Sequence, residues 1–372
     1  MGGYLLVLLV AAAVTYLATP LARRLAERTG AMSPVRERDV HSVPTPRLGG
    51  LAMFVGLATA FVIAQTLPFF SRLFDSSQSP WAILGAAGLI ALVGAIDDVY
   101  QLDAVTKLAG QVLAAGLLAW QGVQLVTLPL GGVVLGSGAL FLVLTVVVVV
   151  VAMNAVNFID GLDGLAAGVM TVAAGAFFVY TYMLTRQTNQ LDYSSLAALV
   201  AAATVGVCLG FLPHNLHPAR IFMGDSGALQ LGLLLAASAV AVTGQVDPAV
   251  VSETQLVPVY FPVVLPAVVL LVPFLDLLLA VVRRVRRGQS PFAPDKLHLH
   301  HRLLAIGHSH RNAVLIMCLW TAVISFGTVV TAFVPIAVWL PVWIGVALVS
   351  VVLTTGPLRG RALRRSGPPG GL

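Results

Sequence analysis

Long apolar runs separated by short polar segments follow one another along nearly the whole chain. Most of these runs approach the roughly 20 residues that a helix needs to cross a hydrocarbon core. Because such runs recur to the end of the chain, they indicate membrane-spanning helices rather than a closed barrel. The sequence therefore predicts an all-α polytopic membrane protein with about eleven spans. The predicted spans lie near residues 4–22, 48–69, 79–96, 107–122, 138–153, 165–185, 195–213, 226–244, 258–282, 312–334 and 336–355.

Two segments outside the spans have other predicted conformations. Residues 122–138 carry no charge, and their β-branched residues around a Pro-Leu-Gly-Gly turn predict a small external β-hairpin. Residues 356–372 form a basic cytoplasmic tail with a composition typical of disorder. Residues 1–355 are therefore expected to form a single integral-membrane domain. Its cytoplasmic loops are expected at residues 23–47, 97–106, 154–164, 214–225 and 283–311.

Positive charge is distributed very unevenly between the two sets of predicted loops. Of the 21 Lys and Arg residues, all except Arg72 and Arg186 lie in loops of one parity. Because basic residues accumulate in cytoplasmic loops, the pattern predicts an external N-terminus and a cytoplasmic C-terminus. We therefore expect a multi-pass protein of the plasma or inner membrane. The pI of about 9.7 follows from this orientation and from contact with anionic lipid, so no nucleic-acid partner is needed to explain it.

The overall composition excludes an ordinary soluble domain. Hydrophobic residues make up 58% of the chain and charged residues only 10%, whereas a soluble domain averages about 45–50% and about 25%. Cys208 and Cys318 both lie in apolar runs, which favours a packing role over a disulfide framework. We therefore expect any chemistry to take place at the membrane surface.

Aspartates gather at the ends of spans on the predicted cytoplasmic face. The segments AIDDVYQLD, NFIDGLDG and RIFMGDSG carry Asp97, Asp98, Asp103, Asp160, Asp163 and Asp225. So many neighbouring carboxylates would repel one another, so a divalent cation is expected, and oxygen ligands without cysteine favour Mg²⁺ or Mn²⁺. The alternative is a set of solvated charges that cap helices, but all three segments share one face of the membrane.

Glycines accompany these aspartates. Gly161 and Gly164 alternate with Asp160 and Asp163, and further glycines flank Asp225. Glycine lets backbone N–H groups approach a phosphate closely, and a helix N-terminus after such a turn favours an anion. Tight turns in which an aspartate caps a helix are the simpler alternative.

Two loops carry additional positive or titratable side chains. Residues 291–302, PFAPDKLHLHHR, place His298, His300 and His301 beside Arg302, which indicates a phosphate-binding or proton-handling loop. Zinc is the alternative, although no matching Cys/His partner appears elsewhere. The first cytoplasmic loop, RERDVHSVPTPRLGG, adds positive charge in a rigid setting, and ordinary positive-inside anchoring is a serious alternative there. The positive charge comes from Arg38, His41 and Arg47.

Three further ionisable residues are expected to be structural or surface groups. Asp276, which lies inside a predicted span, is expected to pair with Arg283 or Arg284. His308 and His310 lie outside the cluster that the preceding histidines form and are expected at the surface.

Aspartates from three loops, a histidine cluster and basic residues at a lipid boundary are typical of metal-dependent phosphoryl transfer onto a lipid. The chain also resembles the polyprenyl-phosphate N-acetylhexosamine-1-phosphate transferases (glycosyltransferase family 4), which start bacterial cell-wall and surface polysaccharides. The resemblance covers nearly the whole chain. The motifs appear in the family's order, as HSVPTPRLGG, GAIDDVYQLDAVTKL, NAVNFIDGLDGLAAG, RIFMGDSG and PDKLHLHHRL.

The histidine motif resembles one branch of that family more than another. HLHH preceded by PDK looks like the branch that uses UDP-N-acetylglucosamine with undecaprenyl or decaprenyl phosphate. The branch that transfers phospho-N-acetylmuramoyl-pentapeptide usually shows a different histidine run and is the alternative. The resemblance implies a UDP-N-acetyl sugar and a polyprenyl phosphate as substrates, Mg²⁺ as cofactor and UMP as a product. A homodimer is a further expectation from the family.

The resemblance also implies roles for matching positions. It gives metal binding to Asp225, with Asp97 and Asp98 near the metal and the lipid phosphate. Catalytic positions implied by the family and the loops are Asp97, Asp98, Asp160, Asp163, His300 and His301. Substrate-binding positions are Asn157, Asn215, Phe222 (which would stack on uracil), Lys107 (at the lipid phosphate), Arg47, His298 and Arg302. Some members carry a third aspartate where this chain has Gln101, so Asp103 receives no role.

Two different classes of function compete with this interpretation. A transporter or channel for nucleotide sugars or metal ions would have charges at mid-membrane depth, broken helices and repeats. Here only Asp276 lies inside a predicted span. A scaffold for envelope enzymes would leave the aspartate and histidine loops unexplained.

Overall fold

The structure is a computed structural model. It describes residues 1–33, 44–125, 129–130, 133–134, 138–188, 194–243, 268, 282, 285–286, 288 and 299–365. For residues 129–130, 133–134, 188, 299–302 and 357–365 it describes the backbone alone.

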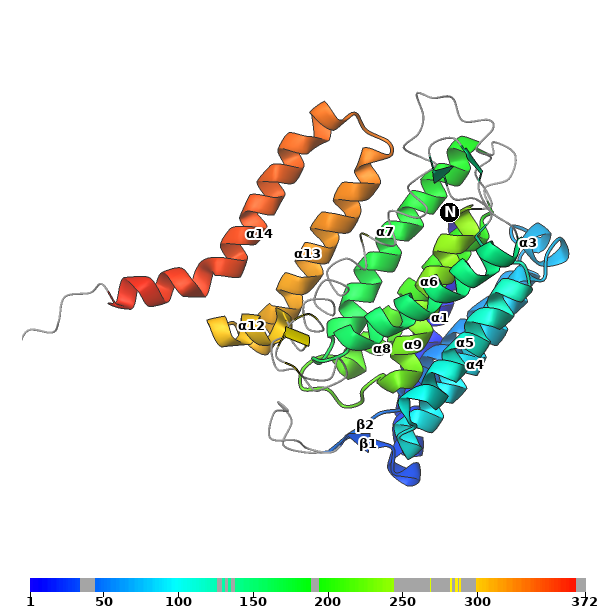
Figure 1. Cartoon of the computed structure of the whole chain (residues 1–372), viewed down its shortest axis with the longest axis horizontal. Coiled ribbons are helices and arrows are strands. Elements are labelled where there is room, and N and C mark those ends of the chain that lie inside the picture. The colour runs from blue at the N-terminus through cyan, green and yellow to red at the C-terminus, as the bar shows by residue number, and fades with distance from the viewer. Residues whose placement is uncertain are drawn as a thin grey trace, which may run out of the picture.

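The described chain is almost entirely helical (Figure 1). Its helices are α1 (Gly2–Thr29), α2 (Gly49–Thr66), α3 (Ser71–Asp75), α4 (Ser79–Tyr100), α5 (Ala104–Trp120), α6 (Gly138–Ile159), α7 (Leu165–Thr188), α8 (Leu196–Asn215), α9 (Gly224–Thr243), α12 (Leu299–Ile306), α13 (His310–Thr331) and α14 (Ile336–Arg365). Within the described residues, nine of these helices are long and apolar enough to cross a membrane. The protein is therefore an all-α polytopic membrane protein, as the sequence predicts.

A helix covers every predicted span except the one at 258–282, which lies almost wholly outside the described residues. The span predicted near 107–122 is the shorter helix α5. The prediction of a disordered tail is wrong for residues 356–365, because α14 continues without a break to Arg365. Residues 366–372 lie outside the described residues.

Two short antiparallel strand pairs complete the described elements. β1 (Met32–Ser33) pairs with β2 (Thr45–Pro46), and β3 (Pro129–Leu130) pairs with β4 (Val133–Val134). The second pair confirms the hairpin predicted for residues 122–138, whereas its external location stays a prediction. In Figure 1 the β1–β2 pair and α12 lie at the lower end of the bundle, and the N-terminus lies toward the upper end.

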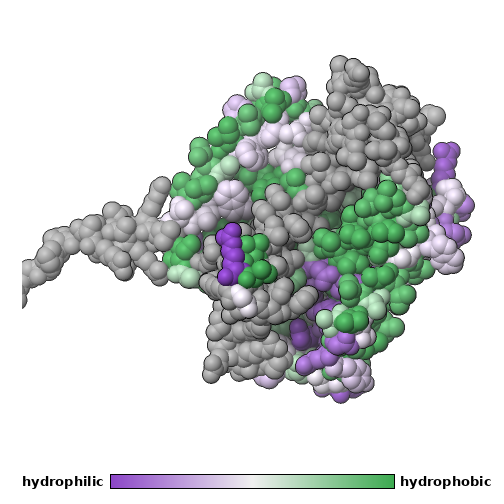
Figure 2. Space-filling model, in the orientation of Figure 1, coloured by the Kyte–Doolittle hydropathy of each residue, from purple (hydrophilic) through white to green (hydrophobic). Residues whose placement is uncertain are grey.

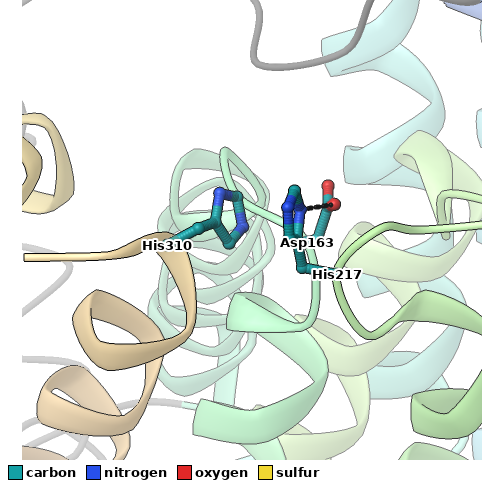
Figure 3. Close-up of side chains that lie close together, drawn as sticks. All are labelled: Asp163, His217 and His310. Atoms are coloured by element: carbon teal, nitrogen blue, oxygen red, sulfur yellow. Dashed lines mark hydrogen bonds and ion pairs between the residues drawn. The ribbon is translucent and has the colours of Figure 1, made fainter.

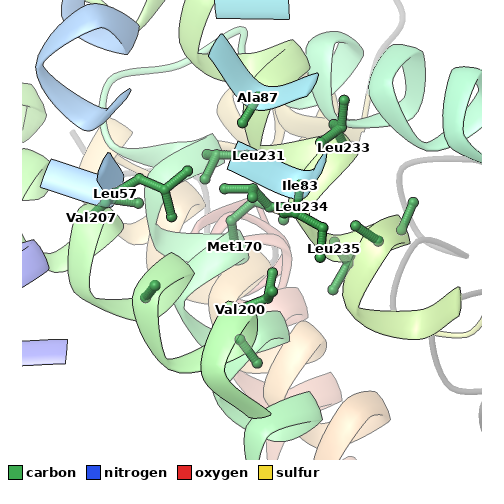
Figure 4. Packing of buried hydrophobic residues seen from close by; sticks show 14 of the residues in the cluster. Leu57, Ile83, Ala87, Met170, Val200, Val207, Leu231, Leu233, Leu234 and Leu235 are labelled. Carbon is green, nitrogen blue, oxygen red and sulfur yellow. The ribbon is translucent and has the colours of Figure 1, made fainter. Parts of the chain in front are cut away.

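Helix α9 forms the centre of the bundle. It packs against α2, α4, α6 and α8 and is buried along almost its whole length. Its side chains Leu231, Leu233 and Leu234 belong to the same buried hydrophobic cluster as Ile83 of α4 and Met170 of α7 (Figure 4). Because lipid is as apolar as leucine, close packing rather than release of water must hold such helices together in a membrane.

Small residues provide that close packing. A Cβ atom at Gly232 of α9 would collide with the backbone of Met153 in α6. Seven of the fifteen buried residues of α8 are likewise alanine or glycine. Figure 2 shows that the outer surface over α4 and α5 is broadly hydrophobic, while hydrophilic residues gather below it at the lower end. A smaller hydrophilic group lies at the right edge, where Figure 1 shows α3, so the lower end is the larger of two polar regions on this face.

Candidate active site

A sharp turn between α4 and α5 brings Lys107 back toward Asp97. Gln101, directly after α4, has a left-handed backbone conformation with φ of 54°, which is uncommon for a residue other than glycine. The turn lets the N–H of Leu102 donate a hydrogen bond to Oδ1 of Asp97 at 2.7 Å. The ammonium of Lys107 lies 3.2 Å from Oδ2 of Asp97. The Asp97 carboxylate is therefore held in place at both oxygens.

Asp103 has a separate, structural task in the same turn. Its carboxylate accepts hydrogen bonds from the N–H groups of Val105 and Thr106 at 2.9 and 3.1 Å, and so caps α5. Hydrogen bonds from the side chain and backbone of Thr106 hold the pKa of Asp103 below its ordinary value. The side chain is exposed, so Asp103 is a helix cap and lies apart from the buried carboxylates.

Lys107 also contacts the carboxylate of Asp225, and this contact joins three helices. Asp97 comes from the end of α4, Lys107 from the second turn of α5, and Asp225 from the first turn of α9. The Lys107 ammonium contacts Oδ2 of Asp225 and lies 3.2 Å from Asp97. Two partly buried carboxylates would raise each other's energy without a cation between them. A positive charge is thus built into the point where these helices meet.

Asn157 orients the Asp225 carboxylate from the opposite side. It lies in the last turn of α6, and its Nδ2 donates a hydrogen bond to Oδ1 of Asp225 at 3.0 Å. With Lys107 on Oδ2, each oxygen of Asp225 has a fixed direction. The NFIDG segment therefore positions the carboxylate that the RIFMGDSG segment supplies.

Asp98 supports the start of α9. It is only 6% exposed, and its two oxygens accept hydrogen bonds from the N–H groups of Asp225 and Ser226 at 3.1 and 3.3 Å. A carboxylate at a helix N-terminus accepts hydrogen bonds from the free N–H groups there. Its negative charge is also attracted to the positive end of the helix dipole. Gly224 has φ of 67°, and a Cβ there would collide with Asp98. Asp98 thus fixes the position of Asp225 through the backbone, and its predicted role as a metal ligand stays a prediction.

The loop that carries Arg47 is anchored to the loop that carries Phe222. The N–H of Phe222 donates to the carbonyl of Pro46 at 2.8 Å, and the N–H of Gly49 donates to the carbonyl of Phe222 at 3.0 Å. These bonds place Arg47 Nε 3.9 Å from Oδ1 of Asp98. Within the described part of the chain, this buried Nε has no hydrogen-bond acceptor. Arg47 is therefore a charged donor that an anion at this site could use.

Asp160 lies in the turn directly after α6, near Arg47, Asp98 and Asp163. Burial raises its pKa to about 7, the nearby Arg47 opposes that rise, and the neighbouring Asp98 and Asp163 add to it. At neutral pH the side chain is therefore divided between its neutral and charged forms. A neutral carboxyl can donate a hydrogen bond, which a carboxylate cannot.

Asp163 and Asn215 tie that turn to the loop before α9. Oδ2 of Asp163 accepts hydrogen bonds from Nδ1 of His217 at 2.8 Å and from the N–H of Ala219 at 3.0 Å. The amide of Asn215 accepts from the N–H of Gly164 and donates to a backbone carbonyl in the same loop. Both ends of the Asn215 amide are thus used within the protein, and its contact with substrate stays a prediction.

His217 and His310 were missed by the sequence reasoning. The prediction that His310 is a surface residue is wrong, because its ring stacks on His217 with centroids 4.3 Å apart and planes inclined by 19°. His308, also expected at the surface, is partly buried and lies 2.8 Å through Nε2 from the carbonyl oxygen of Thr354. No local signal reveals either contact, because each partner is distant in sequence.

The remaining predicted site residues are not described at side-chain level. His300, His301 and Arg302 lie on α12, whose backbone places them at the same end of the bundle as β1 and β2 (Figure 1). A larger group lies outside the described residues, namely Arg38, His41, His298, Asp276, Arg283 and Arg284. The functions expected of these residues stay predictions.

The donor set at Asp97 and Asp225 fits a hard divalent cation. It consists of carboxylate oxygens at the end of α4 and the start of α9, with an amide nearby, and it contains no cysteine or histidine. Mg²⁺ favours this kind of site, with one or two carboxylates and with phosphate oxygens and water as the remaining ligands. Lys107 contributes the positive charge between the two carboxylates. The residues present therefore fit Mg²⁺.

Comparison with known proteins gives a consistent family. A model described as Glycosyl transferase family 4 matches residues 80–243, which run from α4 to the end of α9. "Decaprenyl-phosphate N-acetylglucosaminephosphotransferase" of Mycolicibacterium smegmatis is 46% identical and covers 98% of this chain and 90% of its own length. The protein of the same name from Mycobacterium tuberculosis is 44% identical, over 96% and 89%.

A more distant relative carries a related name. "Probable undecaprenyl-phosphate N-acetylglucosaminyl 1-phosphate transferase" of Bacillus subtilis is 33% identical over 88% of this chain and 84% of its own length. The matched region contains the Asp97, Lys107, Asn157 and Asp225 cluster, and the relatives extend over nearly all of the remaining chain. The chain therefore belongs to the polyprenyl-phosphate N-acetylglucosamine-1-phosphate transferases of glycosyl transferase family 4.

Proposed function

We propose that this protein transfers N-acetylglucosamine-1-phosphate from UDP-N-acetylglucosamine to a polyprenyl phosphate. The products are polyprenyl-diphospho-N-acetylglucosamine and UMP, and the lipid-linked sugar begins a cell-wall or surface polysaccharide. The relatives' names support the lipid and the sugar. The clustering of the polar residues at one end of the bundle supports a reaction at one membrane face, which the charge distribution assigns to the cytoplasm.

In this reaction an oxygen of the polyprenyl phosphate attacks the β-phosphorus of the nucleotide sugar. A bond from that oxygen to the β-phosphorus forms, and the bond between the β-phosphorus and the oxygen bridging to the α-phosphorus breaks. A phosphate monoester has a second pKa of about 6 and is largely dianionic at neutral pH. No strong general base is therefore required, and Asp97 and Asp98 act in positioning rather than in proton abstraction.

The residues of the cluster have complementary tasks. Asp225 and Asp97 would hold Mg²⁺, which when bound neutralises the charge that develops on the transferring phosphoryl group. Asn157 keeps the Asp225 carboxylate in its orientation. Lys107 and Arg47 supply positive charge to the phosphates of the two substrates. Asp160, with its pKa near 7, can donate a hydrogen bond to an anionic oxygen when it is neutral.

The single observation that carries this proposal is the placement of Lys107 between Asp97 and Asp225. It joins two carboxylates and a cation at one point, where α4, α5 and α9 end or begin. Transfer of a phosphoryl group between two anions needs positive charge, because both substrates must approach each other against charge repulsion. Lys107 supplies such a charge, and the two carboxylates would add to it by holding Mg²⁺. The homodimer expected from the family stays a prediction.

The decisive test uses purified full-length protein in detergent with polyprenyl phosphate and Mg²⁺. UDP-N-acetylglucosamine and UDP-N-acetylmuramoyl-pentapeptide are offered separately, and the released nucleotide is identified. We expect UMP from UDP-N-acetylglucosamine, and we expect EDTA to abolish its release. UMP from the pentapeptide substrate alone would assign the protein to the other branch. Release of UDP would mean glycosyl transfer and would overturn the phosphoryl-transfer mechanism.

A further inference from the structure

Three side chains from separate segments meet beside the cluster of Asp97, Lys107 and Asp225. Asp163 lies in the turn between α6 and α7, His217 in the loop before α9, and His310 is the first residue of α13 (Figure 3). One possible ligand atom from each side chain lies within 4.8 Å of those from the other two. Among the described residues, this is the group in which at least three histidine, cysteine or acidic side chains bring possible ligand atoms this close together.

We propose that Asp163, His217 and His310 form a second metal site, selective for a borderline transition metal such as Zn²⁺. Two imidazole nitrogens and one carboxylate oxygen are a common ligand set for zinc, with a fourth position for water or another ligand. The Asp97 and Asp225 site offers oxygen atoms and therefore favours Mg²⁺. The two neighbouring sites thus differ in the class of metal that their donor atoms select.

Part of the arrangement that such a site needs is already present. The Asp163 carboxylate is 4% exposed and receives Nδ1 of His217 at 2.8 Å. The N–H of Ala219 donates to the same oxygen, which fixes the carboxylate on that side. A carboxylate that orients a ligating histidine recurs in zinc sites, where it sets the tautomer and direction of the ring. Without metal, Asp163 therefore orients His217, and on metal binding its carboxylate would exchange that hydrogen bond for a bond to the metal as the third ligand.

His310 must turn for the three donors to converge. Its ring lies nearly parallel to that of His217, with an inclination of 19° and centroids 4.3 Å apart. Stacked rings direct their in-plane nitrogen lone pairs side by side rather than toward one point. His310 is the first residue of α13 and is only partly buried. The proposal requires its side chain to rotate until one nitrogen lies at the distance of about 2.0–2.1 Å that zinc requires.

A metal at this place would determine where α12 lies. Only residues 307–309 separate α12 from His310, and α12 carries His300 and His301. A bond from His310 to the metal would tie the start of α13 to the turn after α6 and to the loop before α9. The backbone of α12 would thereby be fixed relative to the turn after α6.

Zinc binding is tested on the full-length protein, purified in detergent without a histidine tag and stripped of metal. Saturating Mg²⁺ is present throughout, so the carboxylate site does not compete for zinc. Zinc chloride is titrated against a chromogenic chelator, and Co²⁺ is titrated separately to record its visible absorption. We expect His310→Ala and His217→Ala each to lose one equivalent of tightly bound zinc, or to weaken its binding at least about 10-fold.

Matched variants separate a metal site from a stacking contact. His308→Ala removes a histidine two residues away that contacts Thr354, and it should bind zinc like the wild type. His310→Cys keeps a zinc ligand but loses the stacked ring, and it should restore binding and shift the Co²⁺ spectrum toward sulfur ligation. Equal stoichiometry and affinity in the wild type and His310→Ala, both shown to be folded, would overturn the proposal. So would the absence of zinc binding in the wild type. Because no substrate is present, neither result depends on the transferase activity.

Discussion

Nδ2 of Asn157, in the last turn of α6, donates a hydrogen bond to Oδ1 of Asp225, in the first turn of α9, at 3.0 Å. This bond fixes the direction of a carboxylate that is predicted to bind Mg²⁺. We expect Asn157→Ala to lower kcat by about 10–100-fold and to raise the Mg²⁺ concentration needed for half-maximal rate, because the carboxylate loses its orienting partner. The rate of UMP release, measured over a Mg²⁺ titration, checks both effects.

Asn154 provides a matched control one turn earlier on α6. Its Nδ2 donates to Oε1 of Gln111 at 2.6 Å, away from Asp225. Asn154→Ala should therefore leave the Mg²⁺ dependence of the rate unchanged, even if it lowers the thermal stability. An equal shift of the Mg²⁺ requirement in both variants would show that the effect of Asn157→Ala comes from a general loosening of α6.

Removing the charge of Lys107 should make stability depend on a divalent cation. Lys107→Met leaves the partly buried carboxylates of Asp97 and Asp225 without the ammonium that contacts both. We expect a loss of about 1.5–3 kcal/mol of stability in EDTA, the usual effect of removing a charge-assisted hydrogen bond. Thermal unfolding in EDTA and in Mg²⁺ measures this, and Mg²⁺ should stabilise the variant more than the wild type. No difference between the two proteins in EDTA would contradict the electrostatic role given to Lys107.

Asp103 and Asp97, though close in sequence, should respond very differently to substitution. Asp103 is an exposed cap of α5, so Asp103→Ala should lower the stability by about 1 kcal/mol but keep activity close to that of the wild type, because its side chain lies apart from the cluster. Asp97→Asn should lower kcat on the order of 100-fold, because it removes a charge from the cluster. Initial rates at saturating substrate compare the two. A large loss of activity in Asp103→Ala, in folded protein, would mean that the third aspartate of the segment takes part in the reaction.

The sequence predicts the positions of the helices well and their arrangement poorly. An apolar run must become a helix in lipid because every backbone hydrogen bond has to be made within the segment. The run that forms α9 resembles its neighbours in hydropathy, and nothing in it alone reveals that it is the central helix. Its place follows from close contacts such as that of Gly232 with Met153, which only the three-dimensional structure shows.

The same limit applies to the site. The sequence predicts correctly that Asp97, Asn157 and Asp225 lie in one site, because all three lie at helix ends on the same membrane face. Consecutive residues on a helix point about 100° apart, so Asp98 faces the start of α9 while Asp97 faces Lys107. A motif cannot distinguish those directions. His310 was misjudged because its partner His217 lies in another loop, far away in sequence.

The pKa of Asp160 predicts a falling stability with rising pH. Its value is raised from the ordinary 3.8 to about 7, chiefly by burial. Between about pH 4 and about pH 7 the folded protein therefore keeps a proton that the unfolded chain has lost, so its stability decreases as the pH rises through this window and then levels off. The asparagine in Asp160→Asn is uncharged at every pH, so the stability of this variant should depend less on pH in the same window.

Thermal unfolding of the wild type and of Asp160→Asn, from pH 5 to pH 8 in EDTA, measures the difference. The melting temperature of the wild type should fall relative to that of Asp160→Asn as the pH approaches 8. Parallel curves for the two proteins would mean that Asp160 is ionised throughout, with an ordinary pKa. EDTA is required because a bound cation would favour the carboxylate and hide the effect.

Gly224 is the backbone position on which the start of α9 depends. Its φ of 67° is a conformation that other residues rarely adopt, and a Cβ there would collide with Oδ2 of Asp98 and approach the carbonyl oxygen of Arg47. We expect Gly224→Ala to destabilise the protein by at least about 1 kcal/mol and to lower the rate of UMP release, because Asp225 is displaced. Gly116 of α5 is the matched control, since a Cβ there meets nothing within 4 Å. Gly116→Ala should retain full activity and be as stable as the wild type or more so, and an equal loss in both variants would show that the strain at Gly224 has no special importance.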